Sequence, residues 1–275
     1  MKYAQTVCKG ALSMEIHVLA SGSTGNATCL KFGETAVLVD AGISARRIKK
    51  GLDEVGIGVE NLSAVLITHE HTDHINGLKT LMKRYQVPVY TRPDTWDAIS
   101  FRSLLPEVRC LPLADSLDIG NVKVEPFSIS HDAADPVGFS FYHAGRKCCL
   151  ATDLGFVTDP VKKALTGSDT VVLEANHDVD MLKTGSYPWP LKRRIMSNKG
   201  HLSNVDAGWT LVRLAQNRHT DIFLAHLSRE NNRPDIAQTT VTGILEEAGY
   251  TQTADFTLYV TYPDRTVSSD ADGQK

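Results

Sequence analysis

The chain has 275 residues, of which 42% are hydrophobic and 22% charged, the ordinary composition of a globular protein that can bury a sizeable core. Its net charge of −3 argues against a protein that coats nucleic acid, although not against a local basic groove. No apolar run approaches the roughly 20 residues of a membrane-spanning helix. The five cysteines form no CxxC pair, which indicates reduced thiols in a cytoplasmic protein. They are Cys8, Cys29, Cys110, Cys148 and Cys149.

Three segments are expected along the chain. Residues 1–13 lack the long apolar region and the cleavage site of a signal peptide, so we interpret them as a loose leader. Residues 14–265 are expected to form one domain built from two similar halves, because strands and then helices follow one another twice without a Pro-, Gly- or Ser-rich linker. Residues 266–275 are polar and are predicted to be a disordered tail.

A loop of small residues, 21–26, follows the first strand candidate at residues 15–20. Its sequence fits neither a phosphate-binding loop nor a dinucleotide motif. It is therefore either a plain turn or a loop that lets a substrate or a neighbouring loop approach the backbone closely. Residues 27–32 and 36–40 form a predicted hairpin that turns at residues 33–34. Asp40 ends this hairpin, either as a partner that holds a metal-ligating histidine or as the cap of the next helix.

The helix predicted next, at residues 45–55, carries four basic side chains. Such a cluster is typical of a solvated helix face, and a phosphate-contacting patch is the alternative. Further helices are predicted at residues 77–85 and 93–105. The four basic residues are Arg46, Arg47, Lys49 and Lys50.

A histidine-rich motif follows an apolar run that is predicted to be a buried strand. The sequence His-Glu-His-Thr-Asp-His at residues 69–74 places three imidazoles and one non-adjacent carboxylate at the start of a strand-to-helix loop. In an extended turn, His69 and His71 point at one ion, and Asp73 and His74 face a second ion. Imidazole nitrogen and carboxylate oxygen suit zinc, manganese or iron. The motif therefore predicts a metal site.

Polar residues follow predicted strands at four more points in the second half of the chain. Sheet scaffolds gather the residues of a site from the ends of several strands. His177 lies near these positions in sequence only, and we interpret it as structural rather than as a ligand. The other candidates are His131, Asp153, Glu174 and His226.

With these residues in place, the chain resembles the metallo-β-lactamase superfamily over about residues 14–262. The resemblance implies an α/β fold: a four-layer αββα sandwich of two mixed sheets with the helices outside. It also implies a site for two divalent ions, Zn²⁺, Mn²⁺ or Fe, at one edge of the sheets. The implied ligands are His69, His71 and His131 for the first ion, Asp73, His74 and His226 for the second, and Asp153 as the bridge between them.

Longer blocks are similar to the YycJ/WalJ (VicX) branch of this superfamily, which is bacterial and cytoplasmic and is encoded beside a cell-wall two-component system. The branch is regarded as exonuclease-like toward DNA, so the resemblance implies nucleic acid as the substrate and no membrane partner. The blocks run in the order of the branch and comprise residues 19–26, 130–138, 174–178, 187–189, 200–204 and 225–232.

Glu174 and His201 resemble the catalytic accessories of transfer-RNA 3′-processing endonucleases, although the block here reads Gly-His-Leu-Ser and theirs Gly-His-Ser-Thr. The resemblance implies that His201, oriented by Glu174, protonates the departing 3′-oxygen. Asp73, once ligated, accepts a proton from the attacking water. The alternative for His201 is a hydrogen bond at the N-terminus of a helix predicted at residues 205–216 and capped by Asn204.

The leading hypothesis is a binuclear-metal phosphodiesterase, a 5′-to-3′ DNA exonuclease that uses a metal-bound hydroxide. The alternatives are cleavage of RNA, hydrolysis of a thioester or lactone by the same fold, and a non-catalytic accessory role in cell-wall two-component signalling. A basic and aromatic stretch beside His201 suits a nucleic-acid strand, and a solvated helix face explains it equally well. This stretch contains Trp189, Lys192, Arg193, Arg194 and Lys199.

Overall fold

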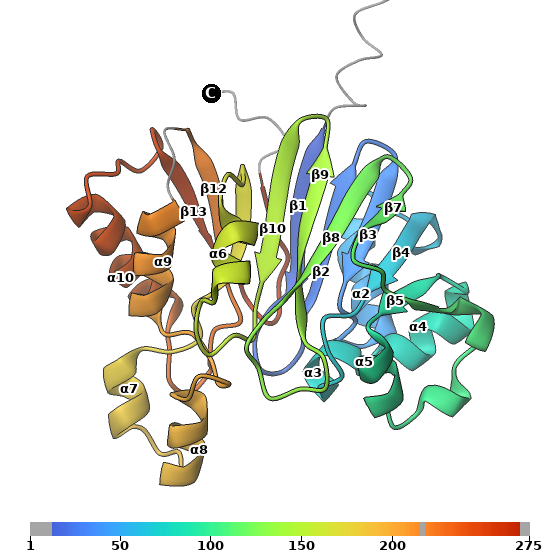
Figure 1. Cartoon of the computed structure of the whole chain (residues 1–275), viewed down its shortest axis with the longest axis horizontal. Coiled ribbons are helices and arrows are strands. Elements are labelled where there is room, and N and C mark those ends of the chain that lie inside the picture. The colour runs from blue at the N-terminus through green and yellow to red at the C-terminus, as the bar shows by residue number, and fades with distance from the viewer. Residues whose placement is uncertain (1–12, 215–217, 270–275) are drawn as a thin grey trace, which may run out of the picture.

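The computed structural model describes residues 13–214 and 218–269. Two mixed β-sheets lie face to face, and helices cover the outer face of each sheet (Figure 1). The predicted four-layer αββα sandwich is therefore confirmed. The expected leader lies outside the described residues, apart from residue 13, and the single domain stays a prediction.

The first sheet combines antiparallel and parallel strands. Strands β14, β1, β2 and β3 pair antiparallel, whereas β3, β4, β5 and β6 pair parallel. The β2–β3 hairpin turns at Gly33 and Glu34 as predicted, and Gly33 has a φ of 57°, which favours glycine. In sheet order the strands are β14 (Val267–Ser268), β1 (Met14–Ala20), β2 (Ala27–Phe32), β3 (Thr35–Val39), β4 (Leu62–Leu66), β5 (Val89–Thr91) and β6 (Cys110–Pro112).

The second sheet repeats this combination of antiparallel and parallel strands. Strands β7 to β10 pair antiparallel in sequence, and β10 to β13 pair parallel. Each half of the chain thus supplies one sheet, apart from β14. In sheet order the strands are β13 (Phe256–Val260), β12 (Thr220–Ala225), β11 (Thr170–Glu174), β10 (Arg146–Ala151), β9 (Val137–His143), β8 (Val122–Ser128) and β7 (Leu117–Ile119).

The helices of the first half are α2 (Ala45–Glu54), α3 (Thr72–Ile75), α4 (Leu78–Tyr85) and α5 (Pro93–Ala98), with short 3₁₀ turns at Val59–Asn61, Arg102–Leu104 and Glu107–Arg109. Those of the second half are α6 (Asp159–Leu165), α7 (Val179–Thr184), α8 (Trp189–Ile195), α9 (Asn204–Leu214) and α10 (Pro234–Glu247). Helices α7 and α8 project beyond the lower edge of the sheets, the edge at which α3 also lies (Figure 1). Among the described residues, no helix is both long enough and apolar enough to cross a membrane.

A hydrophobic core fills the space between the two sheets. Its largest side chains include Phe32 and Phe141, whose rings stack with their centroids 5.7 Å apart. Two more apolar clusters separate each sheet from its helices. Because both faces of the central strands are covered, every residue of β3 and β11 is buried. This packing fixes the strand ends that carry the predicted site.

Two expected boundaries are wrong. The predicted disordered tail contains β14, in which Val267 and Ser268 pair with β1; this pairing satisfies the edge of the first sheet, which composition does not reveal. The rest of the tail, residues 270–275, lies outside the described residues. The helix predicted at residues 93–105 ends at Ala98, because Ile99 takes an extended conformation and buries its side chain.

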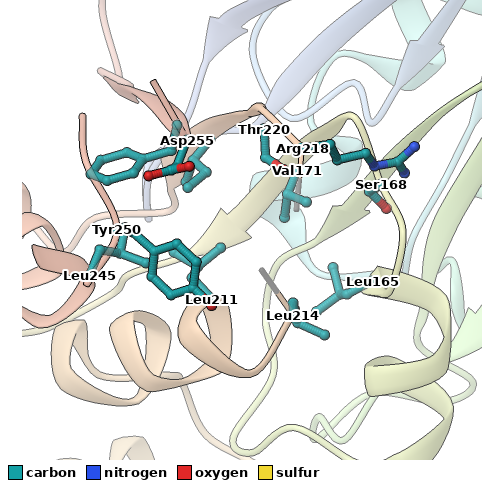
Figure 2. Close-up of a pocket in the computed structure, with 12 residues that line it drawn as sticks. Leu165, Ser168, Val171, Leu211, Leu214, Arg218, Thr220, Leu245, Tyr250 and Asp255 are labelled. Carbon is teal, nitrogen blue, oxygen red and sulfur yellow. The ribbon is translucent and has the colours of Figure 1, made fainter. Parts of the chain in front are cut away.

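A small cavity lies between the second sheet and helices α6, α9 and α10 (Figure 2). Leu165, Leu211 and Leu245 contribute apolar side chains to its lining, and its volume of about 30 Å³ holds about one water molecule. Ser168 and Thr220, which also line it, lie at the start of β11 and β12. The predicted site residues follow the ends of these strands, so the cavity is remote from them.

Candidate metal centre

The predicted site residues meet at one edge of the sheets, where β3, β4, β10 and β12 end. Asp40 and His226 directly follow a strand end, and Asp153 lies two residues beyond one; their φ angles are 62°, 56° and 60°. Non-glycine residues seldom adopt this left-handed conformation, which persists where the surrounding structure imposes it, commonly at functional sites. The ligating atoms lie within 4.8 Å of one another in four overlapping groups: His69, His71 and His131; Asp73, His74 and His226; His69, His74 and Asp153; and Asp153, Glu174, His201 and His226.

The first group consists of three imidazoles whose nitrogens converge. His71 Nδ1 lies 3.1 Å from His69 Nε2 and 3.3 Å from His131 Nε2. Nitrogens that bind one tetrahedral zinc ion at the usual bond length are about 3.3 Å apart. The spacing of these nitrogens therefore fits one shared ion.

The second group contains Asp73, His74 and His226. Asp73 Oδ2 lies 3.6 Å from His74 Nε2 and 3.5 Å from His226 Nε2. Asp153 joins the two groups, because its Oδ2 lies 3.3 Å from His74 Nε2. This oxygen is buried and has no hydrogen-bond partner within residues 13–214 and 218–269, a costly state for a carboxylate unless a cation binds it. The donor set suits divalent metal ions.

Asp40 and Thr68 orient two of the histidines. Asp40 accepts hydrogen bonds from His74 Nδ1 at 2.8 Å and from the backbone N–H of Thr68 at 2.9 Å. The Thr68 hydroxyl donates its one hydrogen to Asp40, so it accepts a hydrogen bond from His69 Nδ1 at 3.0 Å. Both rings thereby turn Nε2 toward the candidate ligand groups. Of the two roles open to Asp40, the structure supports the partner of a metal-site histidine, whereas Ser44 caps α2.

Glu174 has no exposed surface and binds two histidines with one oxygen. Its Oε1 accepts hydrogen bonds from His201 Nδ1 at 2.9 Å and from His226 Nδ1 at 2.7 Å. Its Oε2 accepts the backbone N–H groups of Leu154 and Leu202. Burial raises the pKa of Glu174, but the adjacent His201 outweighs this effect and lowers the pKa to about 2. The carboxylate stays ionised and fixes both rings.

The electrostatics keep His69, His131 and Asp73 ready for a cation. Burial lowers the pKa of His69 well below its ordinary value and also lowers that of His131, so both rings are neutral. Burial raises the pKa of Asp73, but hydrogen bonds from His226 and His74 outweigh it and hold this pKa well below its usual range. Ligands must be deprotonated to bind a metal, and these three groups already are. For His74 and His226, burial lowers the pKa, but the nearby carboxylates outweigh this effect and hold the pKa well above its ordinary value, so these two rings must lose a proton to bind a metal.

The loop of small residues, 21–26, holds the metal-binding loop by its backbone. The Asn26 N–H donates to the carbonyl oxygen of Asp73 at 2.8 Å, and Asn26 Nδ2 lies 3.2 Å from His74 Nε2. A Cβ on Gly42 would lie 1.7 Å from the same Asp73 oxygen, so only glycine fits there. Of the two possible roles of this loop, the structure supports the close approach of a neighbouring loop.

The predicted basic stretch divides into different roles. Lys192 is buried, and its ammonium donates to the carbonyl oxygens of Lys183 and Gly185 at 2.8 and 2.6 Å, so it is unavailable to a substrate. Arg194 Nε donates to Asp132, next to His131, at 2.6 Å. Neither of the two interpretations of this stretch, a nucleic-acid face or a solvated helix face, holds for Lys192, because its side chain is buried.

Several residues of the site escaped the sequence analysis. The Ser21 hydroxyl accepts the His226 N–H at 2.7 Å, and Asn176 Nδ2 donates to the His226 carbonyl oxygen at 2.9 Å. Glu174 was expected to orient His201, and its bond to His226 was missed. In the sequence, the one signal that could have indicated Ser21 and Asn176 was their position next to predicted strand ends. His177 is buried outside all four groups, in agreement with a structural role.

Comparison with known proteins places this geometry in a family. The beta-lactamase superfamily domain matches residues 35–222. The chain belongs to the beta-lactamase superfamily. Exodeoxyribonuclease YycJ of Bacillus anthracis is 38% identical over 255 residues, which are 92% of this chain and 97% of that protein. Exodeoxyribonuclease WalJ of Streptococcus pneumoniae serotype 2 is 38% identical over 258 residues, 92% of this chain and 96% of that one.

These matches confirm the resemblance to the YycJ/WalJ branch of the beta-lactamase superfamily. Among solved structures, the metallo-beta-lactamase fold protein YhfI from Bacillus subtilis superposes with a TM-score of 0.71 at 16% identity. The match covers 94% of this chain and all of YhfI, and it supports the superfamily fold alone.

Proposed function

We propose that this protein is a metal-dependent hydrolase of phosphodiesters, a DNA exonuclease that acts from the 5′ end in the cytoplasm. The observation that carries the proposal is the junction at Asp153, where the two groups of candidate ligands meet beside the Glu174–His201 pair. The names of the relatives, exodeoxyribonucleases YycJ and WalJ, support DNA as the substrate. Four free cysteines among the described residues support a reducing compartment.

Two divalent ions, Zn²⁺ or Mn²⁺, fit the donor set. Ions at this junction would polarise a phosphodiester and activate a water molecule as the nucleophile. The buried Oδ2 of Asp153, which no described residue hydrogen-bonds, supports its role as the bridge between them. The first ion would be held by His69, His71 and His131, and the second by Asp73, His74 and His226.

His201 is the proposed proton donor. Glu174 holds its Nδ1, which leaves Nε2 to carry the transferable proton. The His201 ring lies beside the metal groups, with its centroid 5.3 Å from that of His131 and 5.2 Å from that of His226. Nε2 would protonate the departing 3′-oxygen, while the Glu174 carboxylate stabilises the charged ring.

Asp73 is the proposed acceptor of the proton from the nucleophilic water. Its side chain is 25% exposed, whereas that of Asp153 is 3% exposed, so Asp73 is the more accessible carboxylate of the two metal groups. Its Oδ2 faces His74 and His226, and its Oδ1 would accept the proton.

A cleavage assay tests the proposal. Protein loaded with Mn²⁺ or Zn²⁺ is incubated with end-labelled duplex DNA, single-stranded DNA or RNA. We expect metal-dependent shortening of DNA from the 5′ end, detected by comparing 5′- and 3′-labelled strands. Asp73→Ala should abolish it, and His201→Ala should lower kcat about 10²- to 10⁴-fold, the usual contribution of a general acid.

His219→Ala is the matched control, because His219 lies half-exposed at the start of β12, the opposite end of that strand from His226. The proposal is wrong if Asp73→Ala cleaves as well as the wild type. If all DNA and RNA strands stay intact, and the protein hydrolyses a thioester or lactone at a rate that His201→Ala does not change, the protein is a thioester or lactone hydrolase. Cleavage of RNA alone would retain the mechanism and change the substrate.

A further inference from the structure

Helix α8 presents an unusual stripe to solvent. Trp189, Arg193 and Met196 are spaced at i, i+4 and i+7, which places them on one face of the helix and its last turn. All three are exposed, and the Trp189 indole is 58% exposed. Lys192 and Ile195, by contrast, are buried. Tryptophan and arginine are enriched at binding surfaces, so this stripe is a candidate for one.

The segment that contains this stripe is strongly basic. Between Asp180 and Asp206 the sequence has no acidic residue, whereas the whole chain has a net charge of −3. Arg193 and Lys199 are exposed here. The local charge is therefore complementary to the phosphates of a nucleic acid.

The stripe is rigidly connected to the metal centre. Gly200, just beyond α8, accepts a hydrogen bond from His131 Nδ1 at 3.2 Å. Ser130 donates to the carbonyl oxygen of Asn198 at 2.7 Å, and Arg194 is bound to Asp132. Loop 130–132 and α8 thus form one unit beside the candidate ligands, at the sheet edge where α7 and α8 project (Figure 1).

We propose that this face of α8 is a platform for single-stranded DNA, an inference that rests on the proposed function. Trp189 stacks on a base, and Arg193 and Lys199 contact phosphates of the strand that leads to the metal centre. In a duplex the bases are already stacked on each other, so an exposed indole receives only an unpaired base. The platform makes the protein selective for a single-stranded end, without preference for base sequence.

Intrinsic fluorescence tests the stacking directly, without any turnover. Trp96 is 3% exposed, whereas Trp189 and Trp209 are 58% and 41% exposed, so two indoles can respond to a ligand. With EDTA present to prevent cleavage, a 5′-phosphorylated oligothymidine should quench the wild type and Trp209→Phe. Trp189→Phe should lose the quenching. Undiminished quenching of Trp189→Phe, or equal quenching by a blunt duplex, would overturn the platform.

Anisotropy of a labelled single strand measures the affinity. Trp189→Ala should weaken binding roughly 5- to 100-fold, as loss of one stacked base does, and Trp209→Ala should leave it unchanged. Replacing Arg193 and Lys199 together by alanine should reduce the slope of log K against log salt by about 1.4, or about 0.7 for each lost phosphate contact. Thermal melting of every variant confirms that it is folded.

Arg146→Ala is the control for charge, because Arg146 is exposed at the start of β10, at the opposite end of that strand from Asp153. An unchanged salt slope in the double variant contradicts the phosphate contacts. If the wild type cleaves DNA from the 5′ end and Trp189→Ala binds the single strand as tightly as the wild type does, the platform is refuted and the proposed nuclease activity is retained. Quenching that depends on Trp189, without cleavage of any strand, supports the platform and refutes the nuclease.

Discussion

Hydrogen bonds on Nδ1 turn Nε2 of several site histidines toward the candidate ligand groups, whereas His71 offers Nδ1 itself. Asp40 illustrates this at the residue scale, since it belongs to none of the ligand groups and yet binds both His74 and Thr68. Partners of this kind fix the ring orientation and raise the basicity of the ligand. The buried Asp40 carboxylate therefore contributes to metal affinity without touching the ion.

Asp40→Asn is expected to lower the affinity for divalent metal about 10- to 100-fold, the usual effect of losing such a partner. The amide has no negative charge and only one acceptor oxygen for the bonds from His74 and Thr68. Titration calorimetry with Zn²⁺ measures the change. Asp53→Asn, an exposed carboxylate that pairs with Lys49 on α2, is the control. Equal affinities for the two variants would disprove the role of Asp40.

The residue types of the candidate site are predictable from sequence, and their orientations are not. His69, His71, Asp73 and His74 are adjacent in the chain, so their convergence follows from one loop. The bond from His226 to Glu174 joins residues that are 52 positions apart, and it exists because β11 and β12 pair in parallel. No local pattern reveals that pairing, so this role of Glu174 was missed.

At the scale of elements, the start of α9 shows how tertiary contacts choose between neighbouring residues. The sequence predicts Asn204 as the cap, but Ser203 accepts the N–H of Asp206 at 3.1 Å, and Asn204 instead bonds to Asn232 at 3.0 Å. Ser and Asn are both good caps. The choice depends on Asn232, a residue that lies 28 positions away.

Ser203→Ala should lower the free energy of unfolding by about 1 kcal/mol, because the N–H of Asp206 loses its acceptor. Urea unfolding followed by circular dichroism gives this value. The exposed Ser100→Ala is the matched substitution, for which we expect a change within about 0.5 kcal/mol. If Ser203→Ala proves no more destabilising than Ser100→Ala, the cap contributes nothing.

At the scale of the whole molecule, buried thiols report on the integrity of both sheets. Cys29 lies in the first sheet, and Cys148 and Cys149 lie in the second, all fully buried. Burial raises the pKa of Cys29 and of Cys149 to about 12. At pH 8 only about one in ten thousand of these thiols is ionised and reactive. Cys110 is only partly buried.

Labelling of a Cys8→Ser variant with a thiol reagent at pH 8 should therefore modify Cys110 first. The other three described cysteines should react at the rate of unfolding, and all four should react at once in strong denaturant. Raising the pH increases the thiolate fraction and should speed labelling of Cys110 and of the denatured chain, but not of the three buried thiols, whose rate is set by unfolding. Cys110→Ser should remove the fast phase, and rapid labelling of native Cys148 would show that the second sheet opens locally.

The layer order and the location of the site edge could be predicted, because the motif and the alternation of strands and helices carry them. The pairing of β1 with β14 could not, since it joins residues about 250 positions apart in the chain. The position of α8 beside the metal centre depends on Gly200 and His131, which are also distant in sequence. Such contacts follow from the packed molecule and not from local composition.

The candidate ligands are supplied by both sheets, and this has a consequence for synthesis. His74 leaves the ribosome about 150 residues before His226, an interval of roughly 8–30 s at the usual rate of translation. Asp153 and Glu174 follow His74 by 79 and 100 residues, and His226 comes last. The candidate centre is therefore incomplete until the last strands of the second sheet have been synthesised, so the first half of the chain cannot assemble it alone.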